Sequence, residues 1–168
     1  IIPTGCTLTI QQGTKVHLHK GAVLAADDGA TLIVNGTFAN EVRFMGDRLE
    51  PAYDDVPGQW GAIWFSPLSV NNKIDWAIIK NGTIGILCDS FPATSNPTLR
   101  MNNTIIENMS SMGIYARDSK IRATNCLVAN CGQYAAALTI GGEYSFYHCT
   151  FANYWDYGTP KRSTPSLI

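Results

Sequence analysis

A short pattern that ends in asparagine recurs along this chain and restricts its fold more than any other feature. It reads TFAN, IIKN, IIEN, LVAN and TFAN, ending at Asn40, Asn81, Asn108, Asn130 and Asn153. The last four asparagines are 27, 22 and 23 residues apart. A unit of this length is too short to bury an apolar face alone, so the regular spacing predicts a stack of similar units, a solenoid.

Positions at fixed distances before each asparagine belong to single chemical classes. The second position before it is large and apolar, and the fourth is small. Because side chains alternate across a strand, both positions share a face, which we interpret as the interior. The two series are Phe38, Ile79, Ile106, Val128 and Phe151, and Gly36, Ala77, Thr104, Cys126 and Cys149; seven positions before the asparagine lie Ile33, Ile74, Met101, Ala123 and Phe146.

A bend is predicted between the two apolar segments of each unit. Five positions before the asparagine lie Asn35, Trp76, Asn103, Asn125 and His148, and asparagine tolerates the left-handed conformation of a corner. A third strand is expected after each asparagine, as in IGILCD, MGIYARD and YAAALTI. Strands stacked in register at about 4.8 Å predict an all-β protein, a parallel β-helix of six to seven coils. A leucine-rich solenoid, the alternative, would need a leucine spacing that this sequence lacks.

The period fails in two places. Residues 46–59, with many charged residues, Pro and Gly, are expected to form a loop extruded from one coil, and SFPATSNPT at 90–98 forms a smaller excursion. Loops on a rigid scaffold often carry function, so the region from Gly46 to Trp60 is the first place to look for a site. No second domain is indicated, and we expect residues 1–168 to form one β-helix domain that is a segment of a longer chain.

Composition excludes two classes of partner. The 168 residues are 45% apolar and 15% charged with a formal charge of -1, which fits one globular domain. Without a basic cluster or a long apolar run, neither nucleic-acid binding nor membrane insertion is expected. Five cysteines without metal-ligand spacing predict no zinc site. Cys126 and Cys149 should stack as free buried thiols, and Cys6 should fill an interior column.

Three longer phrases carry a resemblance to a known family. GDRLEPAYDDVPGQWGAIWF, NKIDWAIIKNGTIGI and NCGQYAAALTIGGEYSFYHCTFANYW resemble Bacteroidetes outer-membrane or cell-surface lipoproteins, which are mostly of unknown function. The resemblance implies a right-handed, pectate-lyase-like β-helix and a location in the cell envelope, at the outer-membrane surface, in the periplasm or outside the cell. It assigns no reaction.

Catalytic candidates were sought because the wider superfamily includes polysaccharide lyases and hydrolases. A lyase needs carboxylates that hold Ca²⁺ and an Arg or Lys base, and the loop offers Asp47, Arg48, Glu50, Asp54 and Asp55. Since one loop holds them all, we favour an ion-paired loop clamped on the solenoid. A hydrolase needs two carboxylates at a set distance, and Asp89 and Asp118 with Arg117 are the best cluster on the coils. Glu107 and Lys80 share a column and are expected to pair.

Binding candidates are aromatic. Trp60, Trp64, Tyr154, Trp155 and Tyr157 could stack on sugars or on a partner protein, or could instead fill gaps under loops. His17 and His19 share a strand face but have no third ligand, so no metal site is predicted. We therefore expect a non-catalytic envelope module that binds glycans or envelope proteins, without a cofactor. The alternative is a polysaccharide lyase, which would require Ca²⁺, or a glycoside hydrolase.

Overall fold

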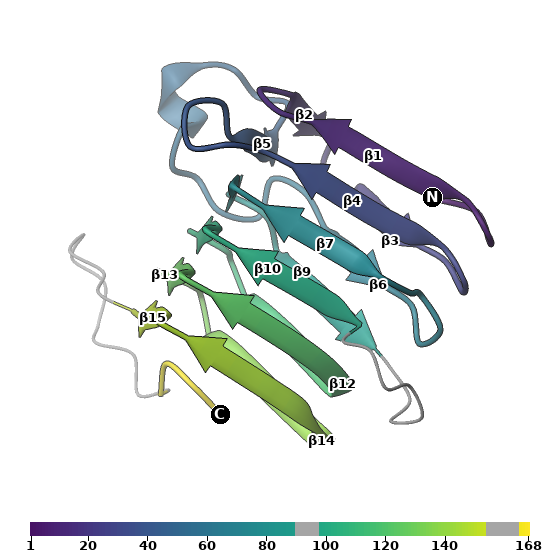
Figure 1. Ribbon diagram of the computed structural model, residues 1–168. Coiled ribbons are helices and arrows are strands. Elements are labelled where there is room, and N and C mark those ends of the chain that lie inside the picture. The colour runs from purple at the N-terminus through teal and green to yellow at the C-terminus, as the bar shows by residue number, and fades with distance from the viewer. Residues whose placement is uncertain (90–97, 154–164) are drawn as a thin grey trace.

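The chain winds as a parallel solenoid of about six turns with three walls (Figure 1). The computed structural model describes residues 1–89, 98–153 and 165–168. Within those residues the one helix is η1 (Pro51–Tyr53), a single short turn, and no helix is long and apolar enough to cross a membrane. Every pair of named strands that bond to each other is parallel, as predicted from the stacked columns.

Each wall collects one strand from each turn. The first wall contains β1 (Thr7–Gln11), β4 (Thr31–Asn35), β7 (Asn72–Asp75), β10 (Leu99–Asn102) and the second halves of β12 (Met112–Thr124) and β14 (Tyr134–Tyr147). The second wall contains β2 (Lys15–Leu18), β5 (Val42–Gly46), β8 (Ala77–Lys80), β11 (Ile105–Glu107), β13 (Leu127–Ala129) and β15 (Thr150–Ala152). The third wall contains β3 (Val23–Ala26), β6 (Ala62–Phe65), β9 (Ile84–Asp89) and the first halves of β12 and β14.

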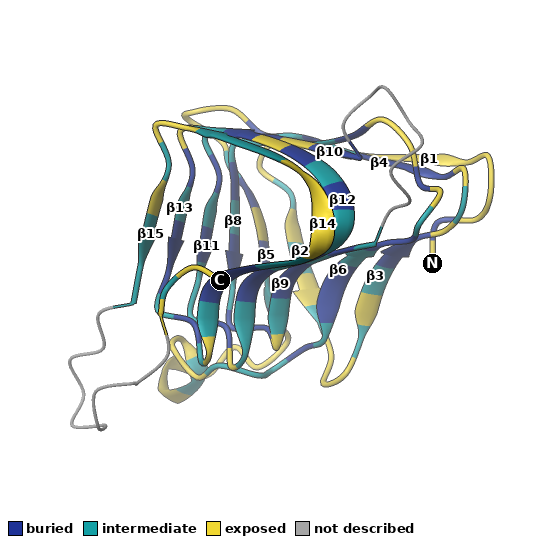
Figure 2. Cartoon of the chain, turned by 90° about the horizontal axis from the view of Figure 1, so that it is seen from below, coloured by how far each residue is buried: buried dark blue, intermediate teal, exposed yellow. Residues whose placement is uncertain are grey.

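The corner between the third and first walls changes along the solenoid. β12 and β14 run through it as single long strands, and Figure 2 shows both ribbons curving from one wall to the other. The bend in β12 lies at Asp118, where φ is 43° and the register with β14 shifts after Arg117. A bulge of this kind lets a strand turn a corner without a loop.

The core consists of stacked columns, and the predicted register is confirmed for coils three to five. Ile79, Ile106 and Val128 are Cα partners across β8, β11 and β13, and each is almost fully buried. Ile74, Met101 and Ala123 form the matching column of the first wall. Each fully buried aliphatic side chain contributes about 1.5–3 kcal/mol through removal from water, so these columns are a main source of stability.

The predicted asparagine corners are also confirmed. Trp76, Asn103, Asn125 and His148 all adopt left-handed backbones with φ of 49–54°, and so do Asn81, Asn108 and Asn130 with φ of 54–65°. The amides bond along the stack: Nδ2 of Asn125 donates to Oδ1 of Asn103 at 2.7 Å, and Nδ2 of Asn108 donates to Oδ1 of Asn81 at 2.7 Å. Asparagine thus supplies both the backbone conformation and a bond to the next coil.

The first TFAN copy does not follow this register, and the prediction for it is wrong. Phe44, not Phe38, is the Cα partner of Ile79, and Val34, not Ile33, is the partner of Ile74. The corner falls at Gly36, where a Cβ would lie 2.0 Å from the carbonyl oxygen of Trp76. Residues 37–40 form a tight turn closed by two backbone hydrogen bonds between Thr37 and Asn40, and Phe38 is 77% exposed.

The cysteines divide by burial. All five are free, as expected for Cys126 and Cys149; Cys126 is buried and Cys149 is half-buried. Desolvation by burial raises the pKa of Cys126 to about 11 and that of Cys88 to about 12. Cys6 is exposed, so its expected place in an interior column is wrong. It precedes β1, the first strand of the stack, and lies outside the apolar columns.

Candidate functional site

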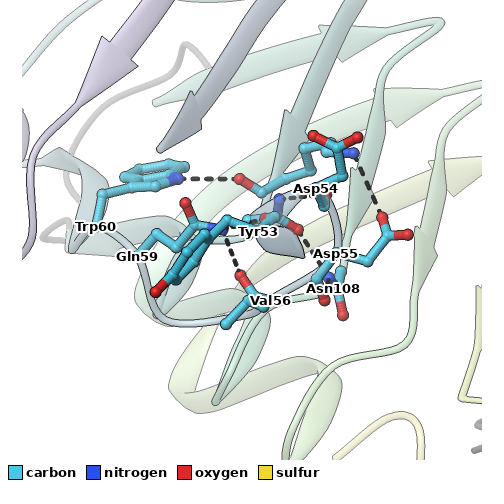
Figure 3. Close-up of polar contacts among 9 residues, drawn as sticks. Tyr53, Asp54, Asp55, Val56, Gln59, Trp60 and Asn108 are labelled. Carbon is cyan, nitrogen blue, oxygen red and sulfur yellow. Dashed lines mark hydrogen bonds and ion pairs between the residues drawn. The ribbon is translucent and has the colours of Figure 1, made fainter. Parts of the chain in front are cut away.

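The loop at residues 46–59 lies folded against the corner of the second wall (Figure 3). Nδ2 of Asn81 donates to the Asp54 carbonyl oxygen at 2.7 Å, and Nδ2 of Asn108 donates to the Asp55 carbonyl oxygen at 2.6 Å. Within the loop, Nε2 of Gln59 donates to the carbonyl oxygens of Tyr53 and Val56 at 2.6 and 2.7 Å. Side-chain amides therefore hold the loop by its backbone.

Apart from Asp54, the charged side chains of this loop form separate pairs. Nδ1 of His19 lies 2.6 Å from Oδ2 of Asp47, and this hydrogen bond lowers the pKa of Asp47. The Arg48 guanidinium lies 3.3 Å from Glu50, and Arg48 also covers the Tyr53 ring at 4.1 Å. The pKa of Glu50 is lowered mainly by a backbone hydrogen bond and next by the hydrogen bond from Arg48. The structure therefore does not bring these loop carboxylates together.

Asp54 and Asp55, the remaining loop candidates, do not belong to a metal-binding cluster of described residues either. Nζ of Lys80 lies 3.5 Å from Oδ1 of Asp55. Glu107 is the register partner of Lys80, as predicted, but the ion pair seen for Lys80 is the one with Asp55. Among the described residues, no group of three or more His, Cys, Asp or Glu side chains could hold a metal ion. The cavity under the loop measures about 80 Å³, room for a few waters and too small for a sugar.

Trp60 is an interior residue, which corrects its place among the binding candidates. The ring is 0% exposed, and its Nε1 donates to the carbonyl oxygen of Lys80 at 2.9 Å. A Cβ on Gly82 would lie 2.8 Å from this ring, so the glycine makes room for it. The ring fills the space beneath the loop and cannot stack on a ligand. Tyr154, Trp155 and Tyr157 lie outside the described residues.

Trp64 lies on the outer face of the third wall, in the same row as Leu87 and Tyr115. Its Nε1 donates to Oδ2 of Asp89 at 3.3 Å, and Arg117 donates to both oxygens of Asp89 at 2.6 and 2.7 Å. This bond with Asp89 raises the pKa of Arg117. Of the predicted cluster, Asp89 and Arg117 lie together, and Asp118 lies at the bend of β12. The three hydrogen bonds hold Asp89 in a fixed position on the outer face of the third wall.

The first wall carries a column of cations that the sequence analysis missed. Lys73, Arg100 and Arg122 are successive Cα partners, one coil apart, on the outer face. The signal was available, because each residue lies eight positions before a corner asparagine. A hollow of about 310 Å³ opens beside the two arginines. Its polar and aromatic lining comprises Arg100, Lys120, Arg122, Glu143, Ser145 and Tyr147.

The two arginines differ from the other cations of this wall in their partners. Lys73 pairs with Asp75 at 2.5 Å and Lys120 pairs with Glu143 at 2.8 Å. Arg122 covers the Tyr147 ring at 5.5 Å. Within residues 1–89, 98–153 and 165–168, no carboxylate forms an ion pair with Arg100 or Arg122. Like charges directly opposite on neighbouring strands repel, so this pair has an electrostatic cost that a bound anion would remove.

Three walls of stacked parallel strands and fixed corners define this chain as a parallel β-solenoid. Residues 2–151 match the family described as right-handed β-helix region, and the chain belongs to that family. This match confirms the predicted right-handed parallel β-helix. No curated protein and no solved structure matches the chain. The likeness to Bacteroidetes surface lipoproteins and to the pectate-lyase branch stays a prediction.

Proposed function

We propose that this protein is a non-catalytic module of the cell envelope that binds acidic glycans on the outer face of its first wall. The observation that carries the proposal is the stacked pair Arg100 and Arg122, which lines the hollow. Neither arginine has a carboxylate partner among the described residues, and Glu143 in the lining pairs with Lys120. Parallel pairing fixes the two Cα atoms about 4.8 Å apart. Guanidinium groups at this spacing can bind the carboxylates or sulfates of one chain through paired hydrogen bonds.

The other residues of the hollow fit a sugar as well as a charge. Its volume of about 310 Å³ lies at the lower end of the range for ligand sites. Tyr147 offers a half-exposed ring for the apolar face of a sugar, and Ser145 offers a hydroxyl group. Glu143 is neutralised by Lys120 at 2.8 Å, so it does not oppose an acidic ligand. Because both arginines are exposed, we expect binding that weakens as salt concentration rises.

A polysaccharide lyase is the second candidate, and one observation favours it. An arginine without an acidic partner beside an acidic sugar is the type of base that such a reaction needs. The binding proposal ranks first because the lining contains one carboxylate, Glu143, which is paired with Lys120. Away from the hollow, Asp47 is hydrogen-bonded to His19, and Glu50 and Asp55 pair with Arg48 and Lys80.

Binding to a glycan panel tests the proposal. The panel contains polygalacturonate, alginate and chondroitin sulfate, with dextran as the neutral control. We expect the acidic polymers to bind at low salt and dextran not to bind. The double variant Arg100→Gln/Arg122→Gln should weaken binding at least tenfold. The control Arg43→Gln removes an exposed cation from the second wall and should bind like the wild type.

Four results would count against this reading. If no acidic polymer binds, or if the double variant binds as well as the wild type, the arginine pair is not a glycan site. If unsaturated uronate products accumulate when Ca²⁺ is added, the lyase candidate replaces the non-catalytic one. If the wild type instead captures an envelope protein through the same arginines, the partner is a protein. The envelope location rests on the family resemblance, and protease accessibility on intact producing cells tests it.

A further inference from the structure

Phe38 and Trp76 form an aromatic pair at the corner between the first and second walls. Their ring centroids lie 5.4 Å apart with an interplanar angle of 77°, an edge-to-face contact. Phe38 nevertheless remains 77% exposed, because the turn at residues 37–40 presents it to solvent. The turn is braced by Thr37, whose Oγ1 donates to Oε1 of Gln12 at 3.0 Å. The pair is a fixed apolar ring surface open to water.

The backbone at this corner is unfavourable for the residue that it carries. Trp76 has φ of 49°, in a column whose later members are Asn103, Asn125 and His148. Left-handed conformations suit asparagine and are costly for bulky side chains. Backbone strain of this kind persists where the surrounding structure enforces it, often at ligand sites. The exposed Phe38 ring and the left-handed Trp76 backbone are each energetically unfavourable. A ligand that covers both rings would account for their presence at one corner.

The pair lies in line with the arginine hollow. Asp75, the residue before Trp76, belongs to a register column that continues through Asn102 and Thr124 to Tyr147. Three strand spacings separate Asp75 from Tyr147, roughly 14 Å. The strip between them is polar, and Nδ2 of Asn102 donates to Oδ1 of Asp75 at 2.8 Å. Ring surfaces thus mark both ends of a polar strip that runs beside the arginine column.

We propose that Phe38 and Trp76 form a second subsite, which stacks on a sugar of the same acidic glycan chain that Arg100 and Arg122 bind. This inference rests on the proposed function, and it adds that the ligand is an oligosaccharide lying across the strands of the first wall. Continuity with the hollow favours a glycan over a protein, since the described residues between the two ends of the strip, Asn102 and Thr124, are polar. A single sugar would reach one subsite only.

Oligosaccharides of two lengths separate the subsites. The probes are a disaccharide and an octasaccharide from each of polygalacturonate and chondroitin sulfate, measured by fluorescence anisotropy. Phe38→Ala should lower octasaccharide affinity about tenfold and leave the disaccharide unchanged. Trp76→Asn should have the same effect on binding without lowering the melting temperature, because it installs the residue type of the other corners. Arg100→Gln/Arg122→Gln should weaken both lengths.

Each other outcome has a defined meaning. If Phe38→Ala binds the octasaccharide as tightly as the wild type, the second subsite is refuted while the proposed function stands. If the wild type binds neither length from either polymer, the proposed function fails and the subsite fails with it. If Phe38→Ala instead dissociates a dimer in sedimentation experiments, the pair is a self-association surface. Because Phe38 is exposed, its removal leaves the core intact, so this variant decides even if Trp76→Asn does not fold.

Discussion

Replacing Asn108 with alanine should release the loop at residues 46–59 and destabilise the whole solenoid. Nδ2 of Asn108 donates to the Asp55 carbonyl oxygen at 2.6 Å and to Oδ1 of Asn81 at 2.7 Å. Its backbone is left-handed, with φ of 58°. One side chain therefore holds the corner conformation, the stack of amides and the loop.

The expected loss follows from these three roles. Two net hydrogen bonds at about 0.5–1.5 kcal/mol each give about 1–3 kcal/mol. Placing alanine in the left-handed region adds roughly 1 kcal/mol. Asn108→Ala should therefore lower the free energy of unfolding by about 2–4 kcal/mol. Asn108→Gly loses the same bonds without the Cβ strain, so it should be less harmful than alanine by roughly 1 kcal/mol.

Asn103→Ala is the matched control. Asn103 is also left-handed, with φ of 50°, and its Oδ1 accepts a bond from Asn125 at 2.7 Å. The control therefore loses a corner and a bond to the next coil at a site that does not hold the loop. Urea unfolding followed by far-ultraviolet circular dichroism measures the stability of each variant. Limited proteolysis measures loop release, which should accelerate in both Asn108 variants and not in Asn103→Ala.

Three results would contradict this reasoning. If Asn108→Ala unfolds within about 0.5 kcal/mol of the wild type, the amide bonds do not contribute as the structure implies. If the loop is cut at the wild-type rate in Asn108→Ala, other contacts hold it, such as Lys80 with Asp55. Equal stability of the alanine and glycine variants would show that the left-handed backbone is not costly at this corner.

Three further predictions concern the interior. Ile106→Asp should abolish cooperative folding, because Ile106 is 0% exposed in a stacked column and the charge would have no partner; circular dichroism without an unfolding transition would show this. Trp60→Phe should cost about 1–3 kcal/mol in urea unfolding, since it leaves the Lys80 carbonyl without its donor and opens a gap against Gly82. Cys88 and Cys126 have pKa values raised by burial from 9.0 to about 12 and about 11. The unfolded chain loses these protons above about pH 9 while the folded chain keeps them, so stability should fall as pH rises from about 9, and less so in Cys88→Ala/Cys126→Ala.

The sequence predicts the repeating part of this fold because its physical requirements repeat. A corner in the left-handed region requires asparagine or a substitute, and an interior column requires an apolar residue at every second position. The positions of Asn81, Asn108 and Asn130 in the sequence therefore predict the register of the strands. The inward column lies seven positions before each corner asparagine, and the position before it, eight positions away, contains Arg100 and Arg122 on the outer face. The cation column was missed because the only outward column compared between coils was that of Lys80 and Glu107 on the second wall.

The register of the first coils could not be predicted from the repeat. Residues 37–40 repeat the letters of residues 150–153, but the register depends on strand pairing between distant residues. Val42 to Phe44 pair with Ala77 to Ile79, which leaves Phe38 in a turn. The burial of Trp60 could not be predicted from the sequence either. Its burial depends on a loop whose path is set by Asn81 and Asn108, residues far along the chain.

These two misreadings change where a ligand should be sought. The long loop at residues 46–59 breaks the period most, yet corner asparagines hold its backbone. Its charged side chains other than Asp54 are paired with one another or with the solenoid. The outer face of the first wall carries charges without acidic partners among the described residues, and rings open to solvent. In a solenoid the core fixes only the inward columns, so the outward ones are free to vary. A column such as Arg100 and Arg122 that keeps one charge across coils, against the repulsion between its members, therefore indicates recognition of an extended anion more strongly than an irregular loop does.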